Sequence, residues 1–320
     1  GMDAVNASHY DGATAPAEAV LMGLKNTEGH TRILLPRGLH PEYKEVIKTY
    51  LSAFECTIKE YSGRPADAAA ALPEQDLAVL VASYPDFFGI IPELQGAAEA
   101  VHAKGGLFVV HADPIMLGLF KSPGAWGADV VTAEGQSLGN DLNYGGPFLG
   151  IMGTTNALVR RLPGRLVGET KDSQGRRGFV LTLVAREQHI RREKATSNIC
   201  SNQNLCILMA SVYMSLMGKN GLREVAEQSL QKAHFARETL LASGLFKPLS
   251  DAPFFNEFAL LSANPVEKLN RVLLENGFIG GYGLSGDYPE FPGGWLVAVT
   301  EKRTREEIER FANCARRVEA

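Results

Sequence analysis

The runs Leu77-Ala78-Val79-Leu80-Val81-Ala82 and Leu107-Phe108-Val109-Val110 decide the fold class of this chain. Both are apolar throughout instead of alternating, which is typical of strands buried on both faces of a parallel sheet. Between them, Pro92–Lys104 opens with proline and carries apolar residues at three- and four-residue spacing, which predicts a crossover helix. The stretch therefore predicts a strand-helix-strand unit of an α/β protein.

The same alternation of strand-like runs and helical stretches extends from about Gly12 to Gly168. It predicts a large, mostly parallel sheet covered by helices on both faces, with a second crossover helix at Pro41–Phe54. The Arg- and Gly-rich segment 160–192 is expected to contain an exposed loop at 171–177. The remaining strands are expected at Arg32–Leu35, Cys56–Glu60, Asp129–Thr132, Phe148–Met152 and Leu166–Glu169.

Two long helices are predicted to lead out of this domain, at Asn202–Met217 and Leu222–Leu241, with glycines between them. We expect residues 1–242 to form the large α/β domain and residues 243–320 a small C-terminal α+β domain. Two domains agree with a length of 320 residues, at about 150 residues per domain. The small domain's elements are expected at Glu257–Leu261, Pro265–Asn276, Trp295–Val299 and Thr304–Val318.

Composition excludes several classes of function. Lys plus Arg is 32 against 36 for Asp plus Glu, a net charge of −4, so nucleic acid is not an expected partner. No continuous apolar run approaches the roughly 18 residues of a membrane span, so no membrane span and no membrane partner are expected. No secretory signal is expected at the start of the sequence either. The cysteines are scattered and the histidines are dispersed, so we expect a cytoplasmic chain with no metal site.

The loop Tyr10-Asp11-Gly12-Ala13-Thr14 runs directly into an Ala-rich helix. Backbone N–H groups at a helix start, a glycine and a hydroxyl suit a phosphate group. The alternative is a capped helix, with Asp11 or Thr14 as the cap, and spacing alone favours the cap.

Polar residues also follow two predicted strands, at the edge where ligands of open α/β sheets bind. Asp113 comes after one of them, where it can hold a protonated ring nitrogen or a metal, or begin a turn. The Gly-rich segment 134–147 follows the next strand, and His40 and His111 also lie at this edge. The pattern G-x-G-x-x-G at 281–286 is rejected as a dinucleotide site, because the prolines after it prevent a helix there.

Taken together, these segments resemble the N-terminal half, or first subunit, of the P-protein of the glycine cleavage system. The resemblance runs from residue 1 to about residue 301. The stretches that carry it are Gly1 to Thr14, Pro85-Asp86-Phe87-Phe88-Gly89, Gly145-Gly146-Pro147 and Arg186-Glu187-Gln188-His189-Ile190-Arg191-Arg192-Glu193-Lys194-Ala195-Thr196-Ser197-Asn198-Ile199-Cys200.

The resemblance implies a pyridoxal-phosphate-dependent transferase fold of type I. It implies that Gly12, Ala13 and Thr14 stand at the phosphate loop and Asp113 at the partner of the pyridine nitrogen. His111, Gly145 and Gly146 are assigned to the same pocket. Gln136 stands where the family's catalytic subunit has the lysine that bonds the cofactor, and an amide cannot form that bond.

We therefore expect a non-lysine-bearing subunit of a two-subunit glycine decarboxylase, with pyridoxal phosphate carried by a lysine-bearing P-protein subunit 2. The resemblance implies a heterotetramer that decarboxylates glycine and transfers the aminomethyl group to the lipoyl H-protein. This chain would line the site with residues of Ser8–Thr14, Gln136–Gly146 and Thr196–Asn198. The alternatives are a free-standing pyridoxal enzyme, which the absent lysine argues against, and a silent scaffold or regulatory pseudoenzyme.

Family members carry a substantial segment before Gly1-Met2-Asp3, so the resemblance implies a shortened sequence. An apolar patch is then expected to be exposed where that segment and the partner pack, and self-association is expected from it.

Overall fold

A computed structural model describes residues 1–27, 29–72, 76–199 and 203–318. The chain divides into two compact units, one of residues 1–84 and 92–218 and the other of residues 85–91 and 219–320. The division falls at Gly218, earlier than the expected boundary after residue 242. The second long helix therefore belongs to the smaller unit.

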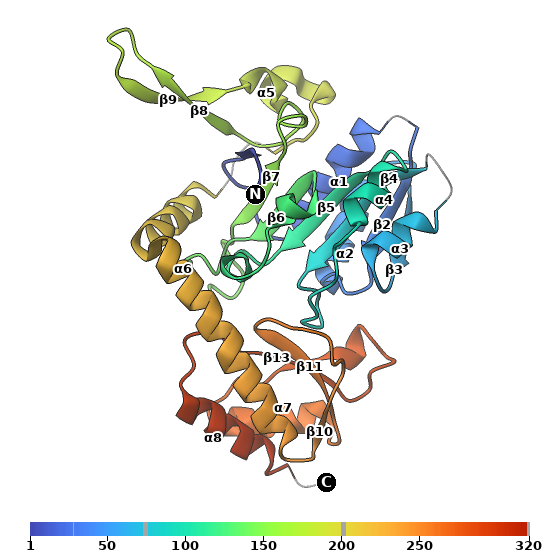
Figure 1. The fold of residues 1–320 in the computed structure, drawn as a ribbon, viewed down its shortest axis with the longest axis vertical. Coiled ribbons are helices and arrows are strands. Elements are labelled where there is room, and N and C mark those ends of the chain that lie inside the picture. Colours follow the sequence, from blue (N-terminus) through green and yellow to red (C-terminus); the bar gives the residue numbers. More distant parts are fainter. Residues whose placement is uncertain (28, 73–75, 200–202, 319–320) are drawn as a thin grey trace. The chain divides into compact units, whose positions relative to one another are not determined.

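The larger unit is built on a sheet with the strand order β1-β7-β6-β5-β4-β2-β3. The pairings from β3 to β6 are parallel, whereas β7 and β1 run antiparallel at the other edge, so the sheet is mostly parallel as expected (Figure 1). The strands are β1 (Ala4–Val5), β2 (Arg32–Pro36), β3 (Thr57–Tyr61), β4 (Leu77–Tyr84), β5 (Leu107–Ala112), β6 (Val130–Glu134) and β7 (Gly150–Thr154).

Helices bury both faces of the central strands. Every residue of β4 is buried, which requires cover on both sides because successive side chains point to opposite faces. Helices α1 and α2 pack on one face, in a core with Ile33, Val79 and Val109. Helices α3 and α4 pack on each other and on β4. Their bounds are α1 (Thr14–Asn26), α2 (Pro41–Leu51), α3 (Pro65–Ala70) and α4 (Ala97–His102), and the 3-10 turns η1 (Met116–Gly118) and η2 (Pro123–Trp126) follow β5.

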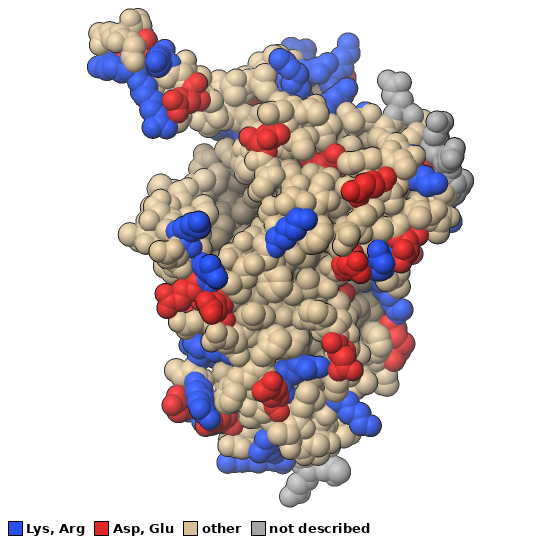
Figure 2. Space-filling view, in the orientation of Figure 1, with Lys and Arg blue, Asp and Glu red and all other residues tan. Residues whose placement is uncertain are grey.

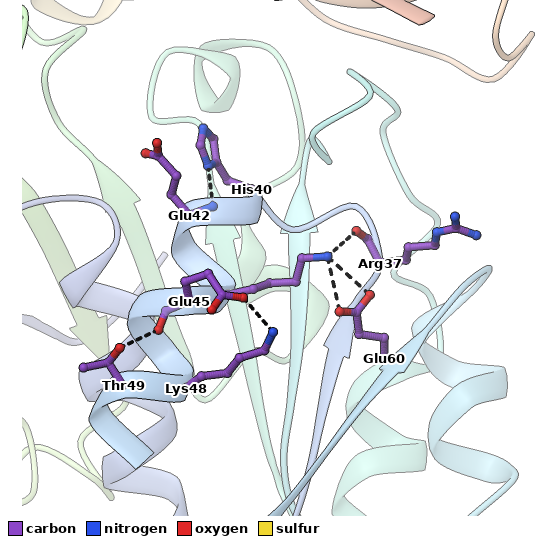
Figure 3. A network of polar contacts seen from close by, with 8 residues as sticks. Arg37, His40, Glu42, Glu45, Lys48, Thr49 and Glu60 are labelled. Carbon is purple, nitrogen blue, oxygen red and sulfur yellow. Dashed lines mark hydrogen bonds and ion pairs between the residues drawn. The ribbon is translucent and has the colours of Figure 1, made fainter. Parts of the chain in front are cut away.

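The surface carries acidic and basic side chains side by side, as Figure 2 shows for one face. An ion pair between the buried Lys44 and the exposed Glu60 ties α2 to β3. The Lys44 ammonium donates to the Arg37 carbonyl oxygen at 3.2 Å and to both Glu60 carboxylate oxygens at 3.3 Å (Figure 3). Glu45 and Lys48 form a separate, exposed pair on α2 at 2.7 Å.

Two expectations about the larger unit were wrong, and one of its helices was not predicted. The strand that begins at Leu166 is not in the large sheet: β8 (Leu166–Lys171) pairs with β9 (Arg177–Thr182) in a separate hairpin, whose turn is the expected exposed loop. The helix expected from Pro92 begins only at α4, after Gly96 in a left-handed conformation (φ 76°). Helix α3 was not predicted, since its six residues are too few to show a helical period. The segment after the hairpin forms η3 (Val184–Arg186), α5 (Gln188–Arg191) and η4 (Arg192–Lys194).

The two predicted long helices form α6 (Asn204–Leu241), which is broken at Gly218, where φ is 60° and ψ −173°. The expected start at Asn202 lies outside the described residues. Before the break, Cys206 and Ala210 are buried, whereas most of the other side chains are exposed. Among the described residues, α6 is the one helix that is long and apolar enough to cross a membrane. Of its most apolar 18-residue stretch, 11% is buried. This helix was not expected to be a candidate span, because serines interrupt its apolar run.

The smaller unit contains an antiparallel sheet with the order β10-β11-β13-β12. Helices α7 and α8 and the second half of α6 enclose a core around Trp295, which is fully buried. This is the predicted small α+β architecture. Its elements are β10 (Phe246–Pro248), β11 (Glu257–Ser262), α7 (Val266–Glu275), β12 (Tyr282–Gly283), η5 (Leu284–Gly286), β13 (Gly294–Ala298) and α8 (Arg305–Ala315).

Candidate functional site

The carboxyl ends of β2, β5 and β6 and the loop before α1 bring a set of polar side chains together in the larger unit. We call this set the edge cluster, and its members are linked by the contacts described below. Of the predicted site residues it includes Gly12, His111 and Gln136, together with His40, whereas Asp113, Gly145 and Gly146 are not members. The members are Asp11, Gly12, His40, Tyr43, His111, Thr132, Glu134 and Gln136.

The start of α1 is closed by the carboxylate of Asp11. Its Oδ1 accepts hydrogen bonds from the backbone N–H groups of Ala13 at 3.0 Å and Thr14 at 2.7 Å, and from the Thr14 hydroxyl at 2.9 Å. These are the donors that a phosphate group at this helix start would use. Of the two interpretations of this loop, a phosphate site or a capped helix, the structure shows the second, with Asp11 as the capping side chain.

The carboxylate of Glu134, the last residue of β6, is held by three backbone N–H groups. Its Oε2 accepts from Gly12 at 2.6 Å, and its Oε1 accepts from Gln136 at 2.8 Å and from Leu149 at 2.9 Å. A Cβ atom on Gly12 would lie 2.6 Å from both the Glu134 Cβ and the Tyr43 hydroxyl oxygen, so only glycine fits here. Burial raises the pKa of Glu134, against the lowering effect of the three N–H groups.

Asp113 lies directly after β5, as predicted, and begins a turn. Its Oδ1 accepts from the backbone N–H groups of Ile115 at 2.7 Å and Met116 at 3.1 Å. Burial raises the pKa of this carboxyl, against the effect of those two bonds. One carboxylate oxygen is thus committed to the chain's own backbone.

His40 and His111 both contact the ring of Tyr43. The Tyr43 ring stacks on His40 at 4.8 Å and meets the His111 ring edge-on at 5.3 Å. His111 Nδ1 lies 3.0 Å from the Thr132 hydroxyl oxygen. Burial, and to a smaller extent His40, lowers the pKa of His111 to about 4, so its imidazole is neutral at pH 7.

Gln136 and the paired glycines lie on one loop after β6. The Gln136 side chain donates to the Asn140 carbonyl oxygen at 2.6 Å. Farther along, Gly145 and Gly146 have φ of 141° and 101°, values that favour glycine. The Tyr144 side chain beside them is 86% exposed. The loop is therefore anchored at Gln136 and open to solvent at its glycines.

Other predicted site residues lie apart from this cluster. Ser8 and His9 are buried, where the Ser8 hydroxyl accepts from the Gln203 N–H at 3.0 Å and burial lowers the pKa of His9 to about 4. Ser197 donates to Glu18 on α1, beside a cavity that no member of the edge cluster lines. Tyr43 and Thr132 were not predicted as members of the site. Glu134 opens the Gly-rich segment 134–147, but the role of its carboxylate was not predicted, although like Asp113 it is an acid at the end of a strand.

Replacing Glu134 by glutamine tests whether its carboxylate holds this edge together. The amide of Glu134→Gln turns an N–H₂ group toward at least one of the N–H donors at Gly12, Gln136 and Leu149. We expect a loss of about 1–3 kcal/mol in the free energy of unfolding, measured by urea denaturation. Glu45→Gln, on the exposed face of α2, is the control and should change it by less than about 0.5 kcal/mol. Equal stability of the two variants would contradict this role of Glu134.

Nearly the whole chain is similar in sequence to proteins of one known family. The family model described as glycine cleavage system P-protein matches residues 1–314. The chain is 52% identical over 317 residues to a probable glycine dehydrogenase (decarboxylating) subunit 1 of Desulforamulus reducens, covering 98% of this chain and 71% of that one. It is 50% identical to the protein of the same description in Geobacillus kaustophilus, covering 98% and 70%.

Solved structures with similar folds include members of the same family and of other families. A crystal structure of glycine decarboxylase (P-protein) of the glycine cleavage system, in inhibitor-bound form, superposes with a TM-score of 0.91 at 42% identity, covering 98% of this chain and 71% of that one. A cysteine desulfurase from Escherichia coli has a TM-score of 0.73 at 12% identity, covering 98% and 78%, a likeness of fold alone.

A large, mostly parallel sheet domain followed by a small antiparallel one is the architecture of pyridoxal-phosphate-dependent enzymes of fold type I, and this chain has that fold. Within that class the matched residues and the identities decide the family. The chain belongs to the glycine cleavage system P-protein family.

The edge cluster does not fit a pyridoxal phosphate bonded to this chain. Gln136 has no amine, and its amide is already hydrogen-bonded to Asn140. The donors at Gly12 to Thr14 are taken by the Asp11 and Glu134 carboxylates, which would also repel a phosphate dianion.

Proposed function

We propose that this chain is the non-lysine-bearing subunit of a glycine dehydrogenase (decarboxylating). In the assembled enzyme it takes part in decarboxylation of glycine and in transfer of the aminomethyl group to the lipoyl H-protein. The observation that carries the proposal is 52% identity, over 98% of the chain, to a relative described as subunit 1 of that enzyme.

Pyridoxal phosphate, in this proposal, is bonded to a lysine-bearing P-protein subunit 2. Two features support this placement: the amide at Gln136 and the carboxylates that fill the start of α1. The same carboxylates favour a second candidate, a silent scaffold or regulatory pseudoenzyme of this fold, since they leave the chain no phosphate site at this edge. A cytoplasmic location is part of the proposal and is supported by the wide spacing of the cysteines.

The partner subunit covers the first half of α6 in this proposal. Leu205, Leu208, Val212 and Leu216 are at least half exposed and recur at three- and four-residue spacing, so they share one face of the helix. The loop of Gln136–Gly146 packs on the same helix, with the Asn140 amide 3.4 Å from the Cys206 carbonyl oxygen. An uncovered leucine stripe of this kind marks a protein interface.

Borohydride reduction tests where the cofactor is bonded. After incubation of the purified chain with pyridoxal phosphate and reduction, we expect no single lysine to be modified, because Gln136 replaces the amine. The lysine-bearing subunit, treated in the same way, should be modified at one lysine, and peptide mass spectrometry reads both results. Modification of one specific lysine of this chain at full occupancy would overturn the assignment.

A further inference from the structure

The larger unit contains a cavity of about 840 Å³ that is separate from the edge cluster. One wall is the second half of α1, the next is the end of α2 with Tyr50 and Phe54, and the third is the segment from Gln188 to Asn198. Cavities of this size hold metabolite-sized ligands. No member of the edge cluster lines it, whereas its third wall includes Thr196–Asn198, which the sequence pattern assigned to the wall of a shared active site.

One end of the cavity carries a buried carboxyl that lacks a partner. Glu18 is 3% exposed, and its Oε1 accepts a hydrogen bond from the Ser197 hydroxyl at 2.6 Å. Its Oε2 is shielded from solvent and has no hydrogen-bond partner among the described residues. Burial raises the pKa of Glu18 to about 7, against the lowering effects of Ser197 and Lys25. A buried carboxylate oxygen without a donor is costly, so this end suits a group that brings an N–H.

The other end is basic. Lys25 follows Glu18 by seven residues on α1, which places it on the same face about 10 Å along the axis. Its ammonium donates to the Thr196 carbonyl oxygen at 2.9 Å and lies 5.5 Å from the centre of the Phe54 ring. Arg192 and His189 line the cavity from α5 and the turn after it, a region over which Figure 2 shows basic side chains gathered. This end suits an anionic group.

We propose that this cavity binds a small zwitterion of the ω-amino acid class, with its ammonium group on Glu18 and its carboxylate on Lys25 and Arg192. The spacing of the two charged ends along α1 favours a ligand whose charges are separated by a carbon chain. Tyr50 and Phe54 supply the apolar wall for that chain. The cavity is separate from the edge cluster, and its test does not require the assembled enzyme.

The proposal fixes the sign of a pH dependence. An ammonium group binds the ionised form of Glu18, so binding releases a proton wherever this carboxyl is protonated in the free protein. Affinity should therefore rise as the pH increases from 6 to 8. The other charged or titratable groups that line the cavity are Lys25 on α1, Tyr50 on α2, and His189, Arg192 and Glu193 on the third wall, and of these Lys25 and Tyr50 interact electrostatically with Glu18. Burial raises the pKa of Tyr50 to about 12, which keeps it neutral over this range.

Calorimetric titration of the full chain with 6-aminohexanoate tests the site, with hexanoate and hexylamine as probes that each lack one charge. We expect 6-aminohexanoate to bind at least tenfold more tightly than either, with affinity rising from pH 6 to pH 8. In Glu18→Gln, 6-aminohexanoate should bind no more tightly than hexanoate, and its affinity should no longer rise with pH. The loss of the pH dependence in this variant shows that Glu18, and not His189, is the titrating group. Lys25→Met should abolish the preference over hexylamine, while Glu45→Gln, on the exposed face of α2, should change nothing.

Three results would overturn the proposal: equal binding of the three probes, no binding at millimolar concentration, or an unchanged preference in both variants. Thermal melting by circular dichroism shows whether each variant is folded. Should Glu18→Gln fail to fold, the comparison of hexanoate with 6-aminohexanoate on the unaltered chain and the Lys25→Met variant still decide the matter. If the Glu18 carboxyl only fixed the segment at Ser197, 6-aminohexanoate and hexanoate would bind with equal affinity.

Discussion

Neither this chain nor its lysine-bearing partner should exchange the carboxyl carbon of glycine with labelled bicarbonate when tested alone, whereas the mixture should do so in the presence of H-protein. We expect the mixture to exceed either subunit by about 100-fold or more, because a misplaced active-site wall costs on that order. The measurement is incorporation of label into glycine at equal subunit concentrations.

The structure indicates which parts of this chain can contribute to such a shared site. The loop before α1 is held by Asp11 and Glu134, so its N–H groups serve the chain's own fold. The loop of Gln136–Gly146 is held at Gln136 and at the buried Asn140, and beyond them it presents Leu142 and Tyr144, which are 68% and 86% exposed. We therefore expect this second loop, and not the first, to line the partner's pocket.

Full activity of the lysine-bearing subunit alone, unchanged by this chain, would contradict the shared site and favour the silent scaffold. Tyr144→Ala gives a finer test, since it should lower exchange by the mixture without weakening assembly. Tyr282→Ala, an exposed tyrosine of the smaller unit, is its matched control and should leave exchange unchanged.

The double variant Leu205→Glu with Leu208→Glu should weaken association with the partner subunit by at least about 100-fold. Burying one leucine side chain contributes about 1.5–3 kcal/mol, and each 1.4 kcal/mol is tenfold in affinity. Both side chains are exposed in the isolated chain, so its own stability should change little. Sedimentation velocity of the mixture, and of the chain alone for self-association, measures the effect.

Leu274→Glu is the control for this variant, because Leu274 is 65% exposed on α7 in the other unit. It should leave association unchanged. Two results would contradict the interface: unaltered sedimentation of the double variant, or flotation of the unaltered chain with lipid vesicles, which would assign the apolar stretch of α6 to a membrane.

Sequence patterns predicted the elements that have a definite period or full burial. The strands at Leu77 and Leu107 were found because fully buried strands are apolar at every position. The hairpin strand β9 was missed because its residues are mostly exposed and show no alternation. The Phe179 side chain, for example, is 63% exposed.

The sequence by itself determined the fold class, the family and the missing amine at Gln136, because each depends on the identity of residues along one strand, helix or loop. The role of the loop before α1 was decided only by the tertiary structure. Glu134 meets the N–H of Gly12 across 122 residues, and Ser197 meets Glu18 across 179. Which donors a carboxylate takes depends on what folding places within 3 Å of it, and local sequence spacing carries no information on such contacts.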